Sequence, residues 1–287
     1  MSTIRPSSDS TQPGRHSGDQ VARLLAGLAD RDRDVRQASA LALGERADRA
    51  AVGAVLAQLW EEPDFFVRDT LTWAASRVGR EAVPLVREAL AADRRPAVRT
   101  QAMHVLSKIA DPATMDDILP LIDDGAPEVA AKARWALSRL GDPRAVPVLL
   151  RQLGTGDAEA QNALTDVVAS FRAAAVPGLI DALAHADPAA RRHAAEVVGH
   201  IGSPHAEPAL AALRSAAEGP DVEVAVSALM AVGEFSSHEA QLVIADATQS
   251  GEPRVRAVAE RLRSRPPRRS RLETLQAVRA ARQAGAS

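Results

Sequence analysis

Residues 129–150 read VAAKARWALSRLGDPRAVPVLL, and this stretch decides the fold. Val129, Ala133 and Leu137 are spaced four residues apart, which places them on one face of a helix. The tripeptide Gly141-Asp142-Pro143 then ends that helix, because glycine suits a helix C-terminus and proline cannot continue a helix. A second apolar segment follows at once and carries its proline early, where the first turn of a helix tolerates it. The stretch therefore predicts two helices joined by a tight turn.

This helical hairpin recurs along most of the chain with a period of about 31 residues. Each copy contains a valine or alanine, usually followed by arginine, which we call the anchor of the repeat. The intervals between successive anchors are 32, 31, 31, 31, 30, 34 and 31 residues. Such a period is typical of a solenoid, in which each unit buries its apolar face against its neighbours. We therefore predict an all-α fold, an α-solenoid that forms a right-handed superhelix of about seven to eight helical hairpins. The anchors are Val35, Val67, Val98, Val129, Ala160, Ala190, Val224 and Val255.

Composition divides the chain into a repeat array and two flanking segments. Residues 1–18 are polar and rich in serine, proline and glycine, so we expect a disordered tail that cannot offset its ordering entropy. Residues 19–264 form the predicted solenoid as one domain. Residues 265–287 begin as a basic, proline-containing linker and end in a candidate capping helix with apolar positions at 272, 275 and 278. Between residues 254 and 287 there are ten arginines and two glutamates.

The overall composition excludes several classes of protein and site. The chain has 287 residues, a formal net charge of −2 and no cysteine, which excludes disulfides, thiolate metal sites and cysteine nucleophiles. There is no apolar run of 18 residues and no signal-peptide core, so we expect a cytoplasmic protein without a membrane span. Lys108 and Lys132 are the only lysines, and we attribute the abundance of arginine mainly to genomic composition.

Two stretches resemble HEAT repeats of the phycobilisome-lyase type. One is Val98-Arg99 followed by Ala102 and Leu106, and the other is LGDPRAVP at 140–147. The resemblance covers about residues 20–264 and implies a helical-repeat fold. Proteins with such repeats serve as protein-binding scaffolds, bilin-lyase subunits, hydroxylases and DNA glycosylases. Function must therefore be argued from the site itself.

Two of the three tryptophans occur at an unexpected position in the repeat. Trp73 and Trp135 each follow their anchor by six residues, about 140° around the helix from the buried face, so we expect both indoles to face outward. The intervening repeat has His104 at the same position. A basic residue follows each of the three by four positions. We call these six residues the ladder and predict that it binds a partner: Trp73, Arg77, His104, Lys108, Trp135 and Arg139.

Other interpretations of these residues remain open at the sequence level. The tryptophans could instead cover a neighbouring helix. His193, Glu196 and His200 share one helical face and are candidate ligands of a divalent metal. We nevertheless predict that the protein binds no metal and no cofactor. HEAT-type hydroxylases that hold a di-iron centre with several His-Glu pairs are similar in fold. This sequence has only one such pair, His238-Glu239, so the other iron ligands are missing.

The leading functional hypothesis is a non-catalytic scaffold that binds a protein or peptide along the ladder. A nucleic-acid or nucleobase-binding protein similar to HEAT-like DNA glycosylases is the first alternative. Arg77 and Arg139 stand one turn after the tryptophans where that family has a catalytic aspartate, and only Asp69 is placed to substitute for it. A lyase or maturation subunit is the second alternative, which the repeat type permits. The sequence contains no nucleophile elbow, phosphate-binding loop or dinucleotide fingerprint.

Overall fold

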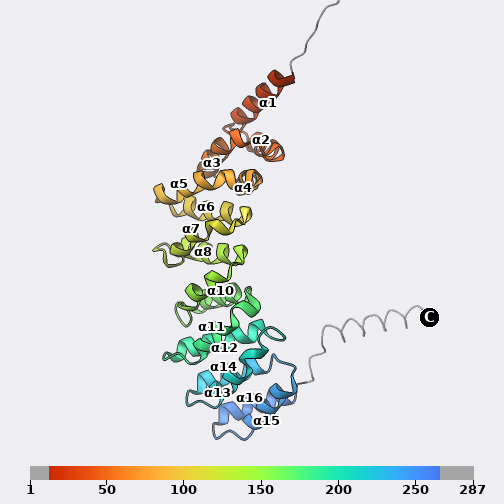
Figure 1. Cartoon of the computed structure of the whole chain (residues 1–287). Helices are drawn as coiled ribbons and strands as arrows, with labels where there is room; N and C mark the ends of the chain where they lie inside the picture. The colour runs from red at the N-terminus through yellow and green to blue at the C-terminus, as the bar shows by residue number, and fades with distance from the viewer. Residues whose placement is uncertain (1–12, 266–287) are drawn as a thin grey trace, which may run out of the picture. The chain divides into compact units, whose positions relative to one another are not determined.

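The computed structural model describes residues 13–265, and every regular element in that range is a helix (Figure 1). The predicted all-α solenoid is confirmed, because the helices form repeated hairpins with the expected period. The chain divides into two compact units, residues 13–142 and residues 143–265 among those described. No described helix is both long enough and apolar enough to cross a bilayer.

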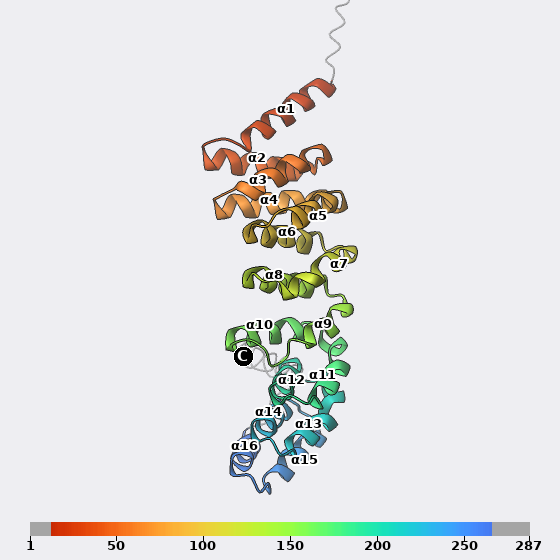
Figure 2. The same cartoon turned by 90° about the vertical axis from the view of Figure 1, so that its left-hand side faces the viewer.

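The first unit is built of two layers of helices. The first helices of successive repeats, α2, α4, α6 and α8, pack side by side in one layer, and α3 and α5 lie in the other (Figures 1 and 2). The second helix of each hairpin packs against the first helix of the following hairpin, as α3 does against α4 and α5 against α6. The bounds are α1 (Pro13–Gly27), α2 (Arg33–Arg46), α3 (Val52–Glu61), α4 (Phe65–Val78), α5 (Val83–Ala92), α6 (Pro96–Ile109), α7 (Met115–Ile118) and α8 (Pro127–Leu140).

The second unit repeats the same arrangement. Its first helices α10, α12, α14 and α16 pack consecutively, and α11, α13 and α15 form the other layer. The bounds are α9 (Val146–Leu150), α10 (Ala158–Ala169), α11 (Val176–Leu183), α12 (Pro188–Ile201), α13 (Leu210–Ala217), α14 (Val222–Val232), α15 (His238–Ala247) and α16 (Pro253–Arg263).

The domain boundaries differ from the predicted ones in two places. Helix α1 begins at Pro13, inside the stretch expected to form the disordered tail, because proline suits a first turn and the helix continues into the half-buried Val21 and Leu24. The chain also divides at Pro143, within the hairpin predicted over 129–150, where the second helix α9 has only five residues. Residues 1–12 and 266–287, with the candidate capping helix, lie outside the described residues.

Small residues allow the first helices to approach closely. Ala102 and Ala133, four residues after their anchors, have no exposed surface, and the anchors Val67 and Val129 are likewise fully buried. Each such contact buries apolar surface, and burial stabilises the fold by about 25 cal/mol per Å². The anchor Val35 is exposed, because only α1 precedes the first repeat.

The arginine after the anchor has a structural role that the sequence pattern does not explain. Arg68 donates to the carbonyl oxygens of residues 62 and 63, six and five positions earlier, at 2.9 and 2.6 Å. Arg191 does the same to residues 185 and 186 at 2.8 and 2.9 Å. These carbonyls lie in the turn that leads into each first helix, where no helical N–H reaches them. The anchor therefore buries its side chain in the core, and the arginine that follows it closes the preceding turn.

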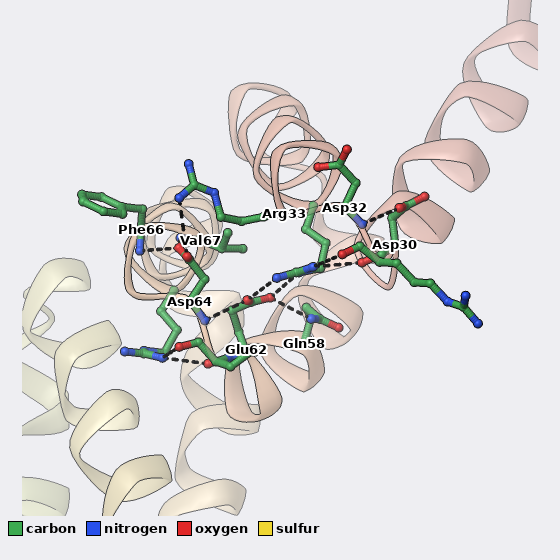
Figure 3. Close-up of polar contacts among 12 residues, drawn as sticks. Asp30, Asp32, Arg33, Gln58, Glu62, Asp64, Phe66 and Val67 are labelled. Carbon is green, nitrogen blue, oxygen red and sulfur yellow. Dashed lines mark hydrogen bonds and ion pairs between the residues drawn. The ribbon is translucent and has the colours of Figure 1, made fainter.

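A buried ion pair joins the two helices of the first repeat. The guanidinium of Arg36 donates to both carboxylate oxygens of Glu62 at 2.8 and 2.9 Å, and the Glu62 side chain has no exposed surface. Gln58 and the Asp64 N–H also donate to this carboxylate, each at 3.0 Å (Figure 3). Burial raises the pKa of Glu62, but the hydrogen bonds from Arg36, Asp64 and Gln58 outweigh it and hold the pKa below its ordinary value.

Several ion pairs on the surface connect neighbouring repeats at a similar spacing. The partners are 30 to 32 positions apart, so each pair joins a residue to a position one repeat away. In the first unit they include Arg80–Asp111 and Arg87–Asp117, at 2.8 and 2.7 Å. In the second unit they include Arg254–Glu223 and Arg214–Asp246. Arginine thus contributes to the interfaces between repeats.

Candidate functional site

The ladder residues lie on the first-helix layer of the first unit. Trp73 is on α4, His104 on α6 and Trp135 on α8, and these three helices follow one another in that layer (Figure 2). Trp135 is exposed, with 36% of its surface accessible, while Trp73 and His104 are half-buried. The expectation that both indoles face outward therefore fits Trp135 well and Trp73 only in part.

His104 and Trp135 are in direct contact across adjacent repeats. Their ring centroids are 5.4 Å apart and the rings meet edge to face at 81°. The ammonium group of Lys132, one turn before Trp135 on α8, lies 3.5 Å from the centroid of the indole ring. A cation at this distance is attracted by the ring face. Trp135 is consequently held in one orientation while part of its surface stays open to solvent.

The charges around this pair shift two pKa values in the same direction. Burial, followed by the charges of Lys132 and Lys108, lowers the pKa of His104 to about 4. Burial and the charge of Lys108 also lower the pKa of Lys132 to about 8. At neutral pH the imidazole is uncharged, and most Lys132 side chains are protonated. The surface is therefore positive because of its lysines and arginines, not because of its histidine.

Trp73 has a different environment from Trp135. Its ring lies against Gly44 of α2, where a Cβ atom added to the glycine would stand 2.3 Å from Cζ3 of the indole. Only a residue without a side chain permits this close approach. Trp73 therefore packs α4 against α2, in line with the alternative interpretation of the tryptophans, and presents only its remaining surface to the solvent.

The three basic ladder residues are not equivalent. Lys108 donates to Asp69 of α4 at 3.2 Å. Arg77 and Arg139 are exposed and form no ion pair or hydrogen bond with any residue that the structure describes. Two guanidinium groups beside the tryptophans are thus available to an external carboxylate or phosphate. Asp69, the acid considered as a substitute catalytic aspartate, is engaged by Lys108.

Two further residues extend this surface and are not identified by the sequence pattern of the ladder. Leu41 is the sixth residue after the anchor Val35, equivalent to Trp73, and 46% of its surface is exposed. Phe66 stands seven residues before Trp73 on the same face of α4 and is 60% exposed. Its neighbour Phe65 is 68% exposed and meets it edge to face at 5.6 Å. Counting six residues from every anchor would have found Leu41.

Equivalent positions in the second unit have another chemistry. They are occupied by Asp166, Glu196, Met230 and Arg261. Asp166 lies 3.6 Å from His200, and Glu196 pairs with Arg192 at 2.8 Å. The aromatic character of the row is therefore a property of the first unit.

The candidate metal ligands are not assembled into a site. His193 is completely buried, and its Nδ1 accepts from the Gly154 N–H at 3.0 Å. Its Nε2 lies 2.9 Å from the Thr165 hydroxyl and 3.1 Å from the Gln161 carbonyl oxygen. Both ring nitrogens are occupied, and no group of three His, Asp or Glu side chains suited to a metal exists among residues 13–265. The sequence pattern fails here because helical spacing does not tell a buried histidine from an exposed one.

Comparison with known proteins identifies the repeat type. The family model of HEAT repeats matches residues 21–107, 83–169 and 176–264. No curated protein matches the sequence. Among solved structures, a complex of Kap95p with RanGDP is 13% identical, with 85% of this chain and 40% of that chain covered and a TM-score of 0.54. This similarity concerns the fold alone.

Two other structures are similar over most of their length but superpose less well. Human deoxyhypusine hydroxylase with glycerol is 18% identical over 87% of this chain and 96% of that chain, with a TM-score of 0.40. The CpcE–CpcF complex of phycocyanin lyase from Nostoc is 21% identical over 92% and 98%, also with a TM-score of 0.40. The family is established by the repeat model, which covers most of residues 21–264. The chain belongs to the HEAT-repeat proteins.

Proposed function

We propose that the protein is a non-catalytic cytoplasmic scaffold that binds a protein or peptide segment along the ladder of the first unit. The observation that carries this proposal is Trp135, an exposed indole held by His104 and Lys132 next to the unpaired Arg139. Tryptophan and arginine are the residues most enriched among binding hot spots. An indole already fixed by its neighbours loses little side-chain entropy on binding.

The charges of the site indicate which kind of segment fits it. Arg77 and Arg139 have no carboxylate partner among the described residues, and Lys132 and Lys108 add positive charge nearby. A segment that places an aspartate or glutamate beside an aromatic or aliphatic side chain would satisfy the guanidinium group and cover the indole together. Charged partners of this kind associate faster at low ionic strength.

Selection of peptides on the purified protein tests the proposal. Peptides displayed on phage are selected against the wild type and against Trp135→Ala, with Leu242→Ala of the second unit as a matched truncation of an exposed apolar residue. We expect acidic peptides with one aromatic or aliphatic residue, whose affinity falls about 10-fold or more in Trp135→Ala and is unchanged in Leu242→Ala. Circular dichroism melts should coincide for the three proteins. Peptides that bind the Trp135 variant as well as the wild type would refute the ladder.

The nucleic-acid alternative is tested with the same proteins. The two unpaired arginines favour it, since guanidinium groups bind phosphate as well as carboxylate. Titration of duplex DNA and single-stranded RNA at increasing salt separates the two hypotheses, because phosphate binding weakens steeply with salt. Tight, salt-sensitive binding that Arg139→Gln weakens would replace the peptide by a nucleic acid.

A further inference from the structure

Lys132 is an amine that lies beside the ladder without an acidic partner. It is half-buried on α8, and its Nζ atom lies 3.5 Å from the centroid of the Trp135 indole. This nitrogen has no hydrogen bond and no ion pair with any residue that the structure describes. Glu128, one turn earlier on α8, is exposed and likewise unpaired within residues 13–265, and His104 of α6 is uncharged at neutral pH. Lys132 therefore lacks the neighbouring carboxylate that would favour its charged form.

The surroundings of Lys132 favour the neutral amine. Burial is the first cause and the charge of Lys108 on α6 the second, and together they lower the pKa of Lys132 to about 8. The acids of neighbouring elements are engaged elsewhere, since Asp69 pairs with Lys108 and the charge of Asp123 acts on Arg134. At pH 7 about one Lys132 side chain in ten is unprotonated, compared with about one in 2,000 for an ordinary lysine.

One face of α8 presents this amine together with an aromatic ring and a cation. Lys132, Trp135 and Arg139 stand at positions i, i+3 and i+7, which brings them onto one side of the helix. Arg139 is exposed and has no partner among the described residues. A guanidinium group binds phosphate through parallel N–H donors. The face thus combines a nucleophile, an accessible apolar surface and a group that binds anions.

An acyl phosphate matches these three groups. Its phosphate suits the guanidinium of Arg139, and its acyl chain can cover the open part of the indole. The unprotonated Nζ atom of Lys132 attacks the carbonyl carbon, the bond from that carbon to the phosphate oxygen breaks, and inorganic phosphate leaves. The amine proton passes to water, and the product is an amide. Acylation removes the positive charge of the side chain.

We propose that Lys132 is a site of covalent acylation by acyl phosphates, whose phosphate group binds Arg139. Lys108, the other lysine of the chain, is a poorer nucleophile because its ammonium group pairs with Asp69 at 3.2 Å. The reaction takes place on the free protein and goes beyond the proposed binding of a peptide. Its failure and the failure of peptide binding can therefore be told apart.

Incubation of the full-length protein with acetyl phosphate, followed by peptide mass spectrometry, tests the site. The chain has only two lysines, so each spectrum compares Lys132 with Lys108 directly. At about pH 7.5 we expect Lys132 to react about 10-fold faster than the side-chain amine of Nα-acetyl-lysine amide in the same solution, because more of it is unprotonated. Lys108 should react more slowly than Lys132. Lys132 that reacts no faster than Lys108, or no faster than the small amine, would overturn the proposal.

Arg139→Gln tests the phosphate contact. We expect acetylation of Lys132 by acetyl phosphate to fall about 3-fold or more, because the bidentate anion contact is lost. Acetylation by a neutral acetyl thioester should not change, since that reagent has no phosphate. Arg77→Gln, the equivalent change on α4, is the matched control and should alter neither rate. Equal rates with acetyl phosphate in Arg139→Gln and the wild type would refute the assigned phosphate site.

Two variants of Lys108 test the electrostatic part of the proposal. Lys108→Arg keeps the neighbouring charge, so the pH midpoint of the Lys132 reaction should stay near about 8. Lys108→Gln removes that charge, so the pKa of Lys132 rises and the midpoint should move to higher pH. Coinciding circular dichroism melts are expected for the variants and the wild type. The same midpoint in both Lys108 variants would contradict the proposed environment of the amine.

Discussion

His193 is a buried polar residue whose two ring nitrogens are both bonded, and this makes the second unit sensitive to acid. Because Nδ1 accepts from Gly154, the neutral ring carries its hydrogen on Nε2. Burial lowers the pKa of His193, the nearby Glu196 and the Gln161 contact raise it less, and Arg192 lowers it. The folded protein therefore keeps the ring neutral at a pH at which the unfolded chain already protonates it.

We expect the second unit to lose stability as the pH falls below about 6.5, the value for an unfolded histidine. Below that pH the unfolded state binds a proton that the folded state resists, so the free energy of unfolding decreases with decreasing pH. Urea unfolding at about pH 7.5 and about pH 5.5 measures the difference, which should shrink in His193→Gln. His104→Gln is the parallel variant in the first unit, where the lowered pKa of about 4 predicts a change of the same sign. Equal pH dependence in all three proteins would contradict this account.

The contact between Gly44 and Trp73 predicts a second residue-scale effect. In Gly44→Ala the new Cβ atom would lie 2.3 Å from the indole and 2.9 Å from the Ala74 Cα atom, which is backbone and cannot turn away. We expect a loss of about 1–3 kcal/mol in the free energy of unfolding, as for other overpacked cores. Gly125→Ala is the control, because a Cβ atom there meets nothing within 4 Å. Chemical denaturation of both variants measures the difference.

Individual residues show how far sequence reasoning reaches. Counting from the anchors places Trp135 and His104 on adjacent helices, and the structure puts their rings in contact. The same count cannot show that Trp73 packs on Gly44, since glycine on the neighbouring helix signals the contact only once the two helices are paired. It also cannot show that Lys132 covers Trp135, because that contact depends on side-chain rotamers.

At the scale of helices, the buried pair between Arg36 and Glu62 connects α2 with the end of α3. In Glu62→Gln the carboxylate is lost while the guanidinium stays close to neutral partners, so we expect a loss of about 3 kcal/mol in the free energy of unfolding. Glu223→Gln, which removes the exposed partner of Arg254, should have a smaller effect that decreases with salt. Urea unfolding at low and high ionic strength compares the two. A salt-sensitive loss in Glu62→Gln would show that the pair is not buried in solution.

Helix boundaries follow from the sequence where a turn signal and the apolar period agree. A Gly-Asp-Pro or Asp-Pro turn predicts the hairpins that contain it. The polar composition around Pro13 predicts a tail, but α1 begins at this residue. The composition hides the fact that proline is a suitable first-turn residue of a helix. The sequence period predicts neither the short length of α9 nor the division of the chain at Pro143. The period depends on the spacing of the anchors and not on the length of each helix.

For the whole molecule, the division into two units predicts that damage stays local. Repeat arrays are stabilised by each repeat and its contacts with its neighbours, so a defect weakens its surroundings first. We expect His193→Gln to increase amide hydrogen exchange in residues 143–265 and to leave residues 19–142 close to the wild type. Hydrogen-exchange mass spectrometry measures both ranges in one experiment. Equal loss of protection in both ranges would mean that the chain unfolds as one cooperative body.

The spacing of the surface ion pairs has a consequence for the history of the protein. Each of these pairs joins a position to one that stands a single repeat away, so donor and acceptor occupy equivalent positions in successive blocks. A single block therefore contains only one member of such a pair, and duplication of one block would place two equal charges side by side at the new junction. Insertion of two consecutive blocks copies donor and acceptor together, so evolution, or a protein engineer, can change the length of the surface offered to partners most readily in steps of two repeats.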